Sequence, residues 1–533
     1  MLRPNKFLFV RPDTYGDIVL FEPVFRLLRQ YSPDCDIVML VRSRYLDIAP
    51  VIPETIQWIG IDINPYANNP FDCKEELNRL RNRLDKIAPD IIVAPLYNKT
   101  WLEFVVASWY PEAIRVSLGN TTLDDMVVDL VSKYLQTDIM TIFSEFVEVS
   151  VNMTEWEKNI ALASMLCHQP VSFLRPQLKL PGNTDKQFEI ILADLGLKNK
   201  QWVACCPAGV ANVSIKKWPA KKYGEAVAWL KNEKNLEVCL IGHSSEKDIL
   251  EAVQEQSKKY GYRPLMWQGN DGEIPLLCGL LKSCEFYFGN DTGTMHIAGA
   301  MDKPVVAIYG GGTWPRFKPA AVSCMAIIQE LPCVGCDWKC HYSTAPCIAA
   351  ISVENVIRYL SEFIDSGTNA GHREIHIQEF SDCSIEIIRQ STKNIRQMYL
   401  EQSSLRRQIV TLTDLLQESE IDRRRRLEQI TDLDNKLQES EIDREKRFKQ
   451  IEQLTSWLKE SEADRNARLE RIRDLESQLD RETRRLNMLE RTYRTLENTH
   501  VVRTARHMGL IRVKPLDAVS ADGEIYQHGS DCS

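Results

Sequence analysis

The chain lacks a surplus of basic residues. Its 66 Lys and Arg residues are outnumbered by 74 Asp and Glu residues, which gives a formal net charge of −8 at pH 7. Proteins that follow the phosphate backbone of nucleic acids need a basic excess, because much of their affinity comes from neutralising phosphates. The composition therefore argues against a nucleic-acid binder, and we expect no nucleic-acid partner.

The chain also lacks long apolar runs. No stretch reaches the roughly 18 consecutive apolar residues that a membrane-spanning helix requires. The first residues, Met1–Val10, enter a strand-like segment directly and lack the charged and then apolar pattern of a secretory signal. We therefore expect a cytoplasmic protein without a transmembrane segment. Peripheral association with the cytoplasmic face of the inner membrane stays open.

Cysteine is not scarce, but its placement suits buried reduced thiols better than a secreted disulfide framework. The 15 cysteines are scattered through apolar segments that read as core strands, such as Trp202–Cys206 and Val238–Leu240. Buried thiols of this kind are typical of a reducing compartment. With 533 residues, 44% of them hydrophobic, the chain is long enough for more than one domain.

The segment Phe288–Ala300 reads as the end of a strand, a polar turn and a helix, and Lys303–Gly310 follows as a second strand. Free backbone amides at a helix N-terminus attract phosphate. His296 falls in the first turn of the expected helix, where an imidazole can hydrogen-bond a diphosphate oxygen. The alternative is a partly exposed capping histidine.

A similar pattern lies near the N-terminus, where Lys6–Leu20 forms an apolar strand, a Gly-Asp turn and a helix. The pattern places Asp17 at the carboxyl end of a first strand, beside the ligand crevice of an open α/β sheet. Asp17 is also where a helix-capping carboxylate is expected. In the second half, Pro207–Gly209 follows another apolar strand, with Lys216 and Trp218 beyond it. The alternative here is a solvated basic face made by Lys216, Lys217, Lys221 and Lys222.

Arg11–Ile18, Lys216–Pro219 and Asn290–His296 together resemble glycosyltransferase family 9, the ADP-heptose:lipopolysaccharide heptosyltransferases and their relatives, over roughly residues 4–365. The resemblance implies a GT-B architecture of two facing Rossmann-like domains and transfer with inversion at the anomeric carbon. The chain departs from the family pattern at Val210–Ile215, and Gly310–Thr313 with Trp314–Arg316 resembles the family's Gly-Pro-Thr loop with Gly at the usual Pro position. The donor-binding residues that the resemblance implies are Gly209, Lys216, Trp218, Asp291, Thr292, Gly293, Thr294 and His296.

Sugar transfer needs one base, which removes the acceptor proton while the nucleoside diphosphate departs. Asp17 is our candidate for that catalytic base. A glycoside hydrolase would need a second carboxylate beside the same bond, and no second motif of this kind is present. Asp34 and Asp36 form an Asp-x-Asp pattern that reads as a turn before a strand. We expect no divalent cation in catalysis.

Four cysteines lie within one short segment, and four thiolates can close a tetrahedral shell around zinc or iron. Similar cysteine loops occur in members of the family that the chain resembles, and in some of them they hold iron. The alternative is a hairpin with reduced thiols. We expect a structural metal rather than a catalytic one at Cys333, Cys336, Cys340 and Cys347.

Alternating strand and helix patterns predict an α/β protein with two Rossmann-like domains and a long α-helical coiled coil. Proline-rich residues 169–182 read as an interdomain linker. The expected divisions are an acceptor domain (1–168), the linker (169–182), a donor domain with the four-cysteine loop (183–365), a hinge (366–394), a coiled coil (395–500) and a disordered tail (501–533). The expected strands are 7–10, 37–41, 58–61, 91–94 and 114–117, then 202–206, 236–241, 265–267, 286–288, 305–309 and 325–328.

Neither proline nor glycine occurs between residues 395 and 496, and related octapeptides recur every 21 residues at Leu416–Arg423, Leu437–Arg444 and Leu458–Arg465. Twenty-one residues are three heptads, so we expect one continuous helix from about residue 404 to 498 and self-association into a dimer or trimer. A solvated single helix is the alternative. The expected seam is Ile409, Leu412, Leu416, Ile430, Leu433, Leu437, Ile451, Leu454, Leu458, Ile472, Leu475 and Leu479.

These observations predict an inverting glycosyltransferase that moves a sugar, heptose by resemblance, from a nucleotide diphosphate donor to a bacterial lipopolysaccharide-type acceptor. Two alternatives remain at this point. One is a protein glycosyltransferase that modifies surface adhesins. The other is a catalytically inactive scaffold whose coil recruits partners; the presence of Asp17, Lys216 and Asp291 argues against it.

Overall fold

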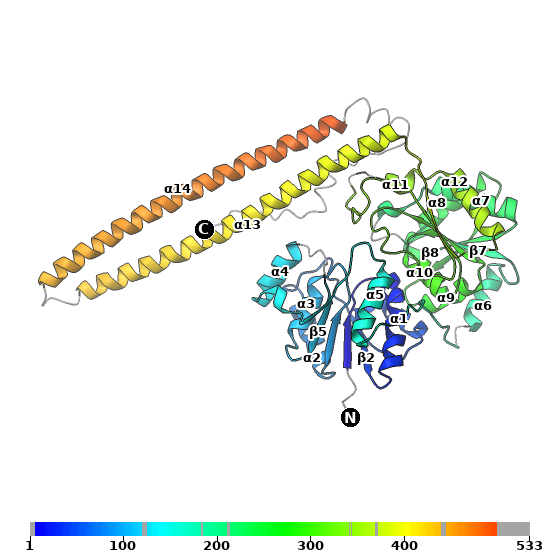
Figure 1. The fold of residues 1–533 in the computed structure, drawn as a ribbon, viewed down its shortest axis with the longest axis horizontal. Coiled ribbons are helices and arrows are strands. Elements are labelled where there is room, and N and C mark those ends of the chain that lie inside the picture. Colours follow the sequence, from blue (N-terminus) through cyan, green and yellow to red (C-terminus); the bar gives the residue numbers. More distant parts are fainter. Residues whose placement is uncertain are drawn as a thin grey trace. The chain divides into compact units, whose positions relative to one another are not determined.

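The computed structural model describes residues 6–119, 125–182, 185–209, 214–340, 342, 344–367, 371–438 and 444–497. The chain forms two compact units, Met1–Ser381 and Asp382–Ser533, which are described separately below. The first unit holds two parallel-sheet α/β domains and the second holds two long helices (Figure 1). The predicted fold class is confirmed. The expected disordered tail, residues 501–533, lies outside the described residues.

The first domain is built on a parallel sheet in the order β3-β2-β1-β4-β5-β6. Its central strand β1 is buried on both faces: Phe7 and Phe9 belong to one apolar cluster, Leu8 and Val10 to another. Burial on both faces requires a continuous apolar run. The strands are β1 (Lys6–Val10), β2 (Asp36–Arg42), β3 (Gln57–Ile61), β4 (Ile91–Ala94), β5 (Ile114–Leu118) and β6 (Glu145–Val147).

Helices cover both faces of this sheet. Apolar residues of α1, such as Phe21, share the cluster of Phe9, while those of α2 and α3, such as Leu77 and Leu102, share the cluster of Leu8. The helices are α1 (Tyr15–Tyr31), α2 (Lys74–Asp85), α3 (Trp101–Ser108), α4 (Asp125–Leu135) and α5 (Glu155–Leu166), with the 3₁₀ helices η1 (Ser43–Val51) and η2 (Ile139–Thr141).

The second domain has a parallel sheet in the order β13-β12-β11-β10-β7-β8-β9. Its strands are β7 (Trp202–Cys206), β8 (Glu237–His243), β9 (Leu265–Gly269), β10 (Phe286–Asn290), β11 (Val305–Tyr309), β12 (Cys324–Ile328) and β13 (His372–His376). Its helices are α6 (Asp185–Asp194), η3 (Ser214–Lys216), α7 (Ala220–Lys234), η4 (Ser244–Glu246), α8 (Lys247–Lys258), α9 (Ile274–Ser283), α10 (Gly293–Ala300), α11 (Pro346–Ala349) and α12 (Val353–Asp365).

The segment 366–394, expected as a hinge, contains regular structure instead. Strand β13 pairs in parallel with β12 along its whole length, from Cys324 opposite His372 to Ile328 opposite His376. Its sequence His-Arg-Glu-Ile-His is polar because β13 is an edge strand, so apolar periodicity could not reveal it. The same segment also contains the start of helix α13 (Asp382–Gln438).

The linker expected at 169–182 runs along both domains of the first unit. The N–H of Lys179 donates to the carbonyl of Val51 in the first domain at 2.8 Å, and the N–H of Leu178 donates to Ala300 in the second at 3.0 Å. Leu178 is buried in the apolar cluster that contains residues of both sheets. The linker is therefore part of the interdomain packing.

The second unit is an antiparallel pair of helices, α13 and α14 (Arg444–Glu497), which lie side by side (Figure 1). Arg426 contacts Asp464 at 2.8 Å, and Asp422 contacts Arg468 at 2.7 Å. In one continuous helix, residues 46 positions apart would lie roughly 70 Å apart, so the prediction of a single long helix is wrong. In the part of the chain that the structure describes, no helix is both long and apolar enough to cross a bilayer.

Candidate active site

The two sheets of the first unit each have a topological switch point. The strand order reverses between β1 and β4 in the first domain, and between β7 and β10 in the second. Ligands of open α/β sheets bind beyond the carboxyl ends of the strands at such points. Helices α1 and α10 begin there and pack against each other. A Cβ added to Gly16 would lie 2.9 Å from Cδ2 of His296, so the N-termini of the two helices lie next to each other.

Asp17 occupies the first turn of α1 and is largely buried. Its Oδ2 atom accepts hydrogen bonds from the Thr14 hydroxyl at 2.7 Å and from the Thr14 N–H at 3.2 Å. The capping role weighed from the sequence is therefore real. It uses one carboxylate oxygen, while Oδ1 lies 3.9 Å from the guanidinium of Arg11. The capping contacts therefore leave Oδ1 without a hydrogen bond from Thr14.

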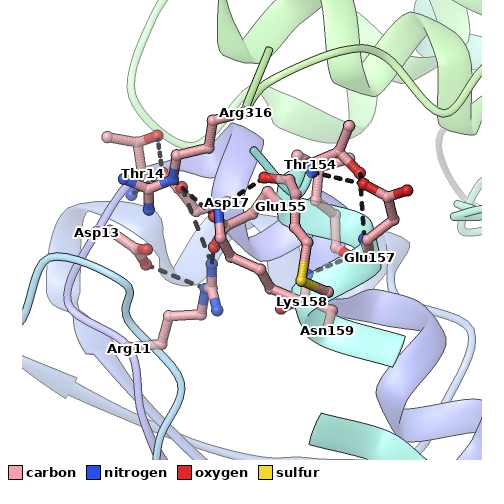
Figure 2. A network of polar contacts seen from close by, with 12 residues as sticks. Arg11, Asp13, Thr14, Asp17, Thr154, Glu155, Glu157, Lys158, Asn159 and Arg316 are labelled. Carbon is pink, nitrogen blue, oxygen red and sulfur yellow. Dashed lines mark hydrogen bonds and ion pairs between the residues drawn. The ribbon is translucent and has the colours of Figure 1, made fainter. Parts of the chain in front are cut away.

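Arg11, at the end of β1, organises a buried network of charges (Figure 2). The side chain of Arg11 is fully buried and contacts Asp13 at 3.3 Å and Glu155 of α5 at 3.0 Å. The other oxygen of Glu155 accepts from Nε of Arg316 at 2.7 Å. Arg316 follows β11 in the second domain, so the network joins the two domains.

Burial and charge act in opposite directions on these groups. Burial would raise the pKa of Glu155, but Arg316 and Arg11 overcome it and lower that pKa to about 2. Burial raises the pKa of Asp13 well above its usual range, although Arg11 opposes the shift. Glu155 therefore stays ionised at any working pH, whereas Asp13 is driven toward its neutral form.

In the second domain, Asn290 at the end of β10 holds the neighbouring turns together. Its Nδ2 donates to the carbonyl of Pro207 after β7 at 2.9 Å, and its Oδ1 accepts from the hydroxyl of Tyr223 at 2.8 Å. The next residue, Asp291, lies 3.7 Å from Nζ of Lys216. The ammonium of Lys216 is therefore held at the carboxyl end of β10, and its side chain is 15% exposed.

The lysines near Lys216 do not form a uniform solvated face. Lys222 donates to the carbonyls of Ala349 and Ile351 at 2.8 and 2.7 Å. Trp218, expected to bind the donor, is 2% exposed, and its indole N–H donates to Ile351. The ring of Trp218 is thus part of the core and supports the turn that carries Lys216.

Gly209 has a φ of 77°, in the left-handed region that favours glycine. A Cβ at this position would lie 2.9 Å from Cγ2 of Thr292, the N-cap residue of α10. The N–H of Gly209 donates to the carboxylate of Glu246 at 2.9 Å. Glycine is therefore required for the close approach of the β7 and β10 turns. Sequence reasoning missed Glu246, which ties this turn to the end of β8.

His296 is 5% exposed, so it is not the partly exposed capping residue considered from the sequence. Burial lowers its pKa to about 4, which keeps the imidazole neutral near pH 7. Among the described residues, Nδ1 of His296 has no hydrogen-bond partner. The helix carries Gly293 and Thr294 in its first turn and no acidic side chain there. Its N-terminal amides therefore favour an anion.

Residues 133–342 match the family described as Glycosyltransferase family 9 (heptosyltransferase). Lipopolysaccharide heptosyltransferase 2 of Salmonella typhimurium is 28% identical over 321 residues, 59% of this chain and 85% of the relative. This part of the chain is therefore similar to glycosyltransferase family 9. Lipooligosaccharide heptosyltransferase 2 of Haemophilus ducreyi is 23% identical over 330 residues, 61% of this chain and 88% of the relative. A family 9 glycosyltransferase structure from Veillonella parvula has a similar fold, with a TM-score of 0.53 at 16% identity, over 69% of this chain and 99% of its own.

The match to this family and these relatives support glycosyltransferase activity. The matched range holds the donor-side residues from Gly209 to His296 together with Glu155 and Arg316, but not Asp17. Glu155 and Arg316 had no signal in the sequence beyond an acidic first helical turn and a basic residue in a loop. Their partnership depends on the fold, because 161 residues separate them.

The cysteine loop packs against the glycine-rich loop after β11. The N–H groups of Gly335 and Asp337 donate to the carbonyls of Gly311 and Gly312 at 2.8 and 2.9 Å. Trp338 lies so close to Gly312 that its ring leaves no space for a Cβ there. The four predicted ligands, Cys333, Cys336, Cys340 and Cys347, line one small cavity. Within the described ranges, no group of three or more His, Cys, Asp or Glu residues is positioned to hold a metal ion.

Proposed function

We propose that this chain is an inverting glycosyltransferase of the cytoplasm that transfers heptose from a nucleotide diphosphate donor to a lipopolysaccharide-type acceptor. The relatives named as heptosyltransferases support the sugar and the acceptor class. One observation of the structure carries the proposal: the N-terminus of α1, which bears Asp17, lies next to the N-terminus of α10, which favours an anion.

In the proposed reaction, an acceptor hydroxyl attacks the anomeric carbon from the side of the first domain. Its proton passes to Oδ1 of Asp17, the oxygen that the Thr14 cap leaves available. The new glycosidic C–O bond forms as the bond between the anomeric carbon and the diphosphate oxygen breaks. The configuration inverts because a single displacement occurs. The electron pair leaves with the nucleoside diphosphate.

The departing diphosphate carries the developing negative charge, so its stabilisation falls to the second domain. Lys216 supplies a cation at the carboxyl end of β10. The amides of Gly293 and Thr294 supply donors at the helix N-terminus. Neutral His296 adds a hydrogen-bonding nitrogen without adding charge. Asp291 positions Lys216 through their 3.7 Å contact.

The test is a thermal-shift screen of the purified protein against a panel of nucleotide sugars, followed by a transfer assay with the donor that stabilises it. ADP-heptose should raise the melting temperature most, since a ligand that binds the folded state stabilises it. No shift with any nucleotide sugar would overturn the proposal. Stabilisation without transfer to any acceptor would favour an inactive scaffold, and transfer to a protein would favour an adhesin-modifying enzyme.

We propose further that the four-cysteine loop holds a structural zinc or iron ion. Four thiols that line one cavity are a donor set suited to either metal. A bound ion would fix the loop that hydrogen-bonds Gly311 and Gly312 beside the donor site. Elemental analysis of the purified protein should give close to one ion per chain. Metal near zero, with all four thiols titrating freely under native conditions, would remove this proposal.

We also propose that the second unit mediates homo-oligomerisation. Large apolar side chains remain exposed on the helix pair, including Leu416 at 39%, Ile451 at 48% and Trp457 at 54%. The intrachain pairing of α13 with α14 thus uses part of the apolar surface that the heptads provide. Burial of the rest against a second copy would remove it from water.

A further inference from the structure

Helix α5 belongs to the first domain, yet its first turn is completed by the second. The N–H of Glu155, its first helical residue, donates to the carbonyl of Arg316 at 2.6 Å. The first amides of a helix have no partner within the helix. The carboxylate of Glu155 also accepts from Nε of Arg316 at 2.7 Å. The loop after β11 therefore binds α5 through both the backbone and the side chain of Arg316.

The same helix holds the base-bearing helix α1. The second carboxylate oxygen of Glu155 accepts from Arg11 at 3.0 Å, and Arg11 reaches Asp13 and Asp17. One turn further along α5, Nδ2 of Asn159 donates to the carbonyl of Leu20 in α1 at 2.9 Å. Leu20 lies one turn beyond Asp17. Helix α5 therefore contacts α1 directly through Asn159 and, through Arg11, reaches Asp17.

These contacts are buried, which makes them sensitive to any loss of a partner. Glu155 is 0% exposed, and the guanidinium of Arg316 lies 5.3 Å above the ring of Tyr97 in the first domain. Lys158 lies 4.4 Å from the same ring. Removing one member of a buried ion pair leaves the other charge without compensation. Loss of either Glu155 or Arg316 should therefore loosen the contact between α5 and the loop after β11.

We propose that Glu155 is a positioning residue. It fixes helix α1, which carries Asp17, relative to the loop after β11, so that the proposed base is correctly placed when the second domain contacts α5. Glu155 is fully buried, so we assign it no contact with either substrate. It acts through Arg316 on one side and through Arg11 on the other. This inference rests on the proposed function for its kinetic consequence, but the mechanical link between the domains stands independently of any substrate.

The mechanical link is tested by hydrogen exchange of the full-length protein without ligand. Arg316→Gln leaves the Arg11 contact of Glu155 in place but removes the guanidinium from the second domain. We expect exchange in the first turn of α5 to accelerate by at least about tenfold, because local opening becomes easier. Unchanged exchange in α5 would overturn the proposal, whether or not the protein is an active transferase.

The kinetic consequence is tested by a double-mutant cycle with Glu155→Gln, Arg316→Gln and the double variant. Each single change should lower kcat on the order of 10²-fold, with the donor KM changed less than about threefold, because a base displaced by about 1 Å loses this much rate. If the two residues act as one device, the double variant should be no slower than the worse single variant. Multiplying effects of the two changes would contradict the proposal.

Glu157→Gln is the matched control. Glu157 lies in the same first turn of α5, and its carboxylate accepts hydrogen bonds from the N–H and the hydroxyl of Thr154, in the first domain. Gln can keep this capping box, so kcat should stay within about twofold.

Arg316→Lys serves as the rescue variant: it should recover part of kcat by restoring a cation opposite Glu155. If Glu155→Gln does not fold, exchange and the Arg316 variants still decide the outcome. A wild-type protein without transferase activity would sink the proposed function alone.

Discussion

The two ends of the candidate site share a backbone plan and differ in charge. In each domain a buried strand, a short turn and a helix N-terminus meet at the switch point of a parallel sheet. At α1 the turn is crowded with ions, because Arg11 pairs with Asp13 and approaches Asp17. At α10 the first turn carries no acidic residue, and His296 is neutral.

This difference separates two tasks. At α1 the carboxylate of Asp17 already occupies the helix N-terminus through the Thr14 cap, so that end is poorly suited to an anion. At α10, no acidic side chain of the first turn neutralises the positive end of the helix dipole, so this end can bind an anionic ligand. In the reaction that we propose, one backbone arrangement thus serves for proton removal in the first domain and for diphosphate binding in the second. The predictions below probe this division.

The largest effect is expected from Asp17→Asn. The amide oxygen can still accept from Thr14, so the helix cap is retained while the base is lost. Turnover should fall on the order of 10² to 10⁴-fold with nucleotide binding nearly unchanged. Steady-state kinetics and calorimetric titration of the nucleotide measure the two quantities. Asp34→Asn, in an exposed turn, is the control. Turnover near that of the wild type in Asp17→Asn would remove the assignment of the base.

On the donor side, Lys216→Ala should weaken binding of a nucleoside diphosphate by about 10 to 100-fold, the range for a lost hydrogen bond to a charged group. Lys217→Ala is the matched control, because Lys216 rather than its neighbour pairs with Asp291. Its effect should stay within about threefold. Calorimetric titration compares the two variants directly. Equal small losses would return Lys216 to the solvated face considered from the sequence.

The neutral state of His296 predicts a pH dependence of stability. Its pKa falls from 6.5 in the unfolded chain to about 4 in the folded one. The unfolded state therefore binds more protons between these values, and acidification below 6.5 destabilises the fold. At pH 5 this costs about 2 kcal/mol in the free energy of unfolding. His296→Gln should lose less stability than the wild type between pH 7.5 and 5 in urea unfolding. Parallel losses would contradict the assignment.

The sequence predicted the features that a local residue pattern determines, namely the buried strands and the aspartates in the turns that follow them. Strands β4, β7 and β11 coincide with the apolar runs at Ile91–Ala94, Trp202–Cys206 and Val305–Tyr309, because a strand buried on both faces requires continuous apolar residues. Asp17 and Asp291 were found for a related reason: each follows a buried strand at a turn. The structure brings both to the switch points where the crevice was expected.

The rest depends on contacts between distant residues. Glu155 reads as an ordinary acidic residue in a first helical turn, and its partners Arg11 and Arg316 lie 144 and 161 residues away. The antiparallel pairing of α13 with α14 escaped detection for a different reason. The octapeptides Leu416–Arg423 and Leu437–Arg444 are identical, and neither glycine nor proline marks a break between the helices.

The smallest effect on the site is expected from removing the second unit. The cut should follow Ser381, because a cut near residue 370 would delete β13, which pairs with β12. Both helix ends at the site belong to the first unit, so nucleotide binding should stay within about twofold. Association should be lost, because the exposed Leu416 and Trp457 are removed. Light scattering on both proteins decides: a monomeric full-length chain, or an oligomer that survives truncation, would show that the helix pair does not hold the assembly together.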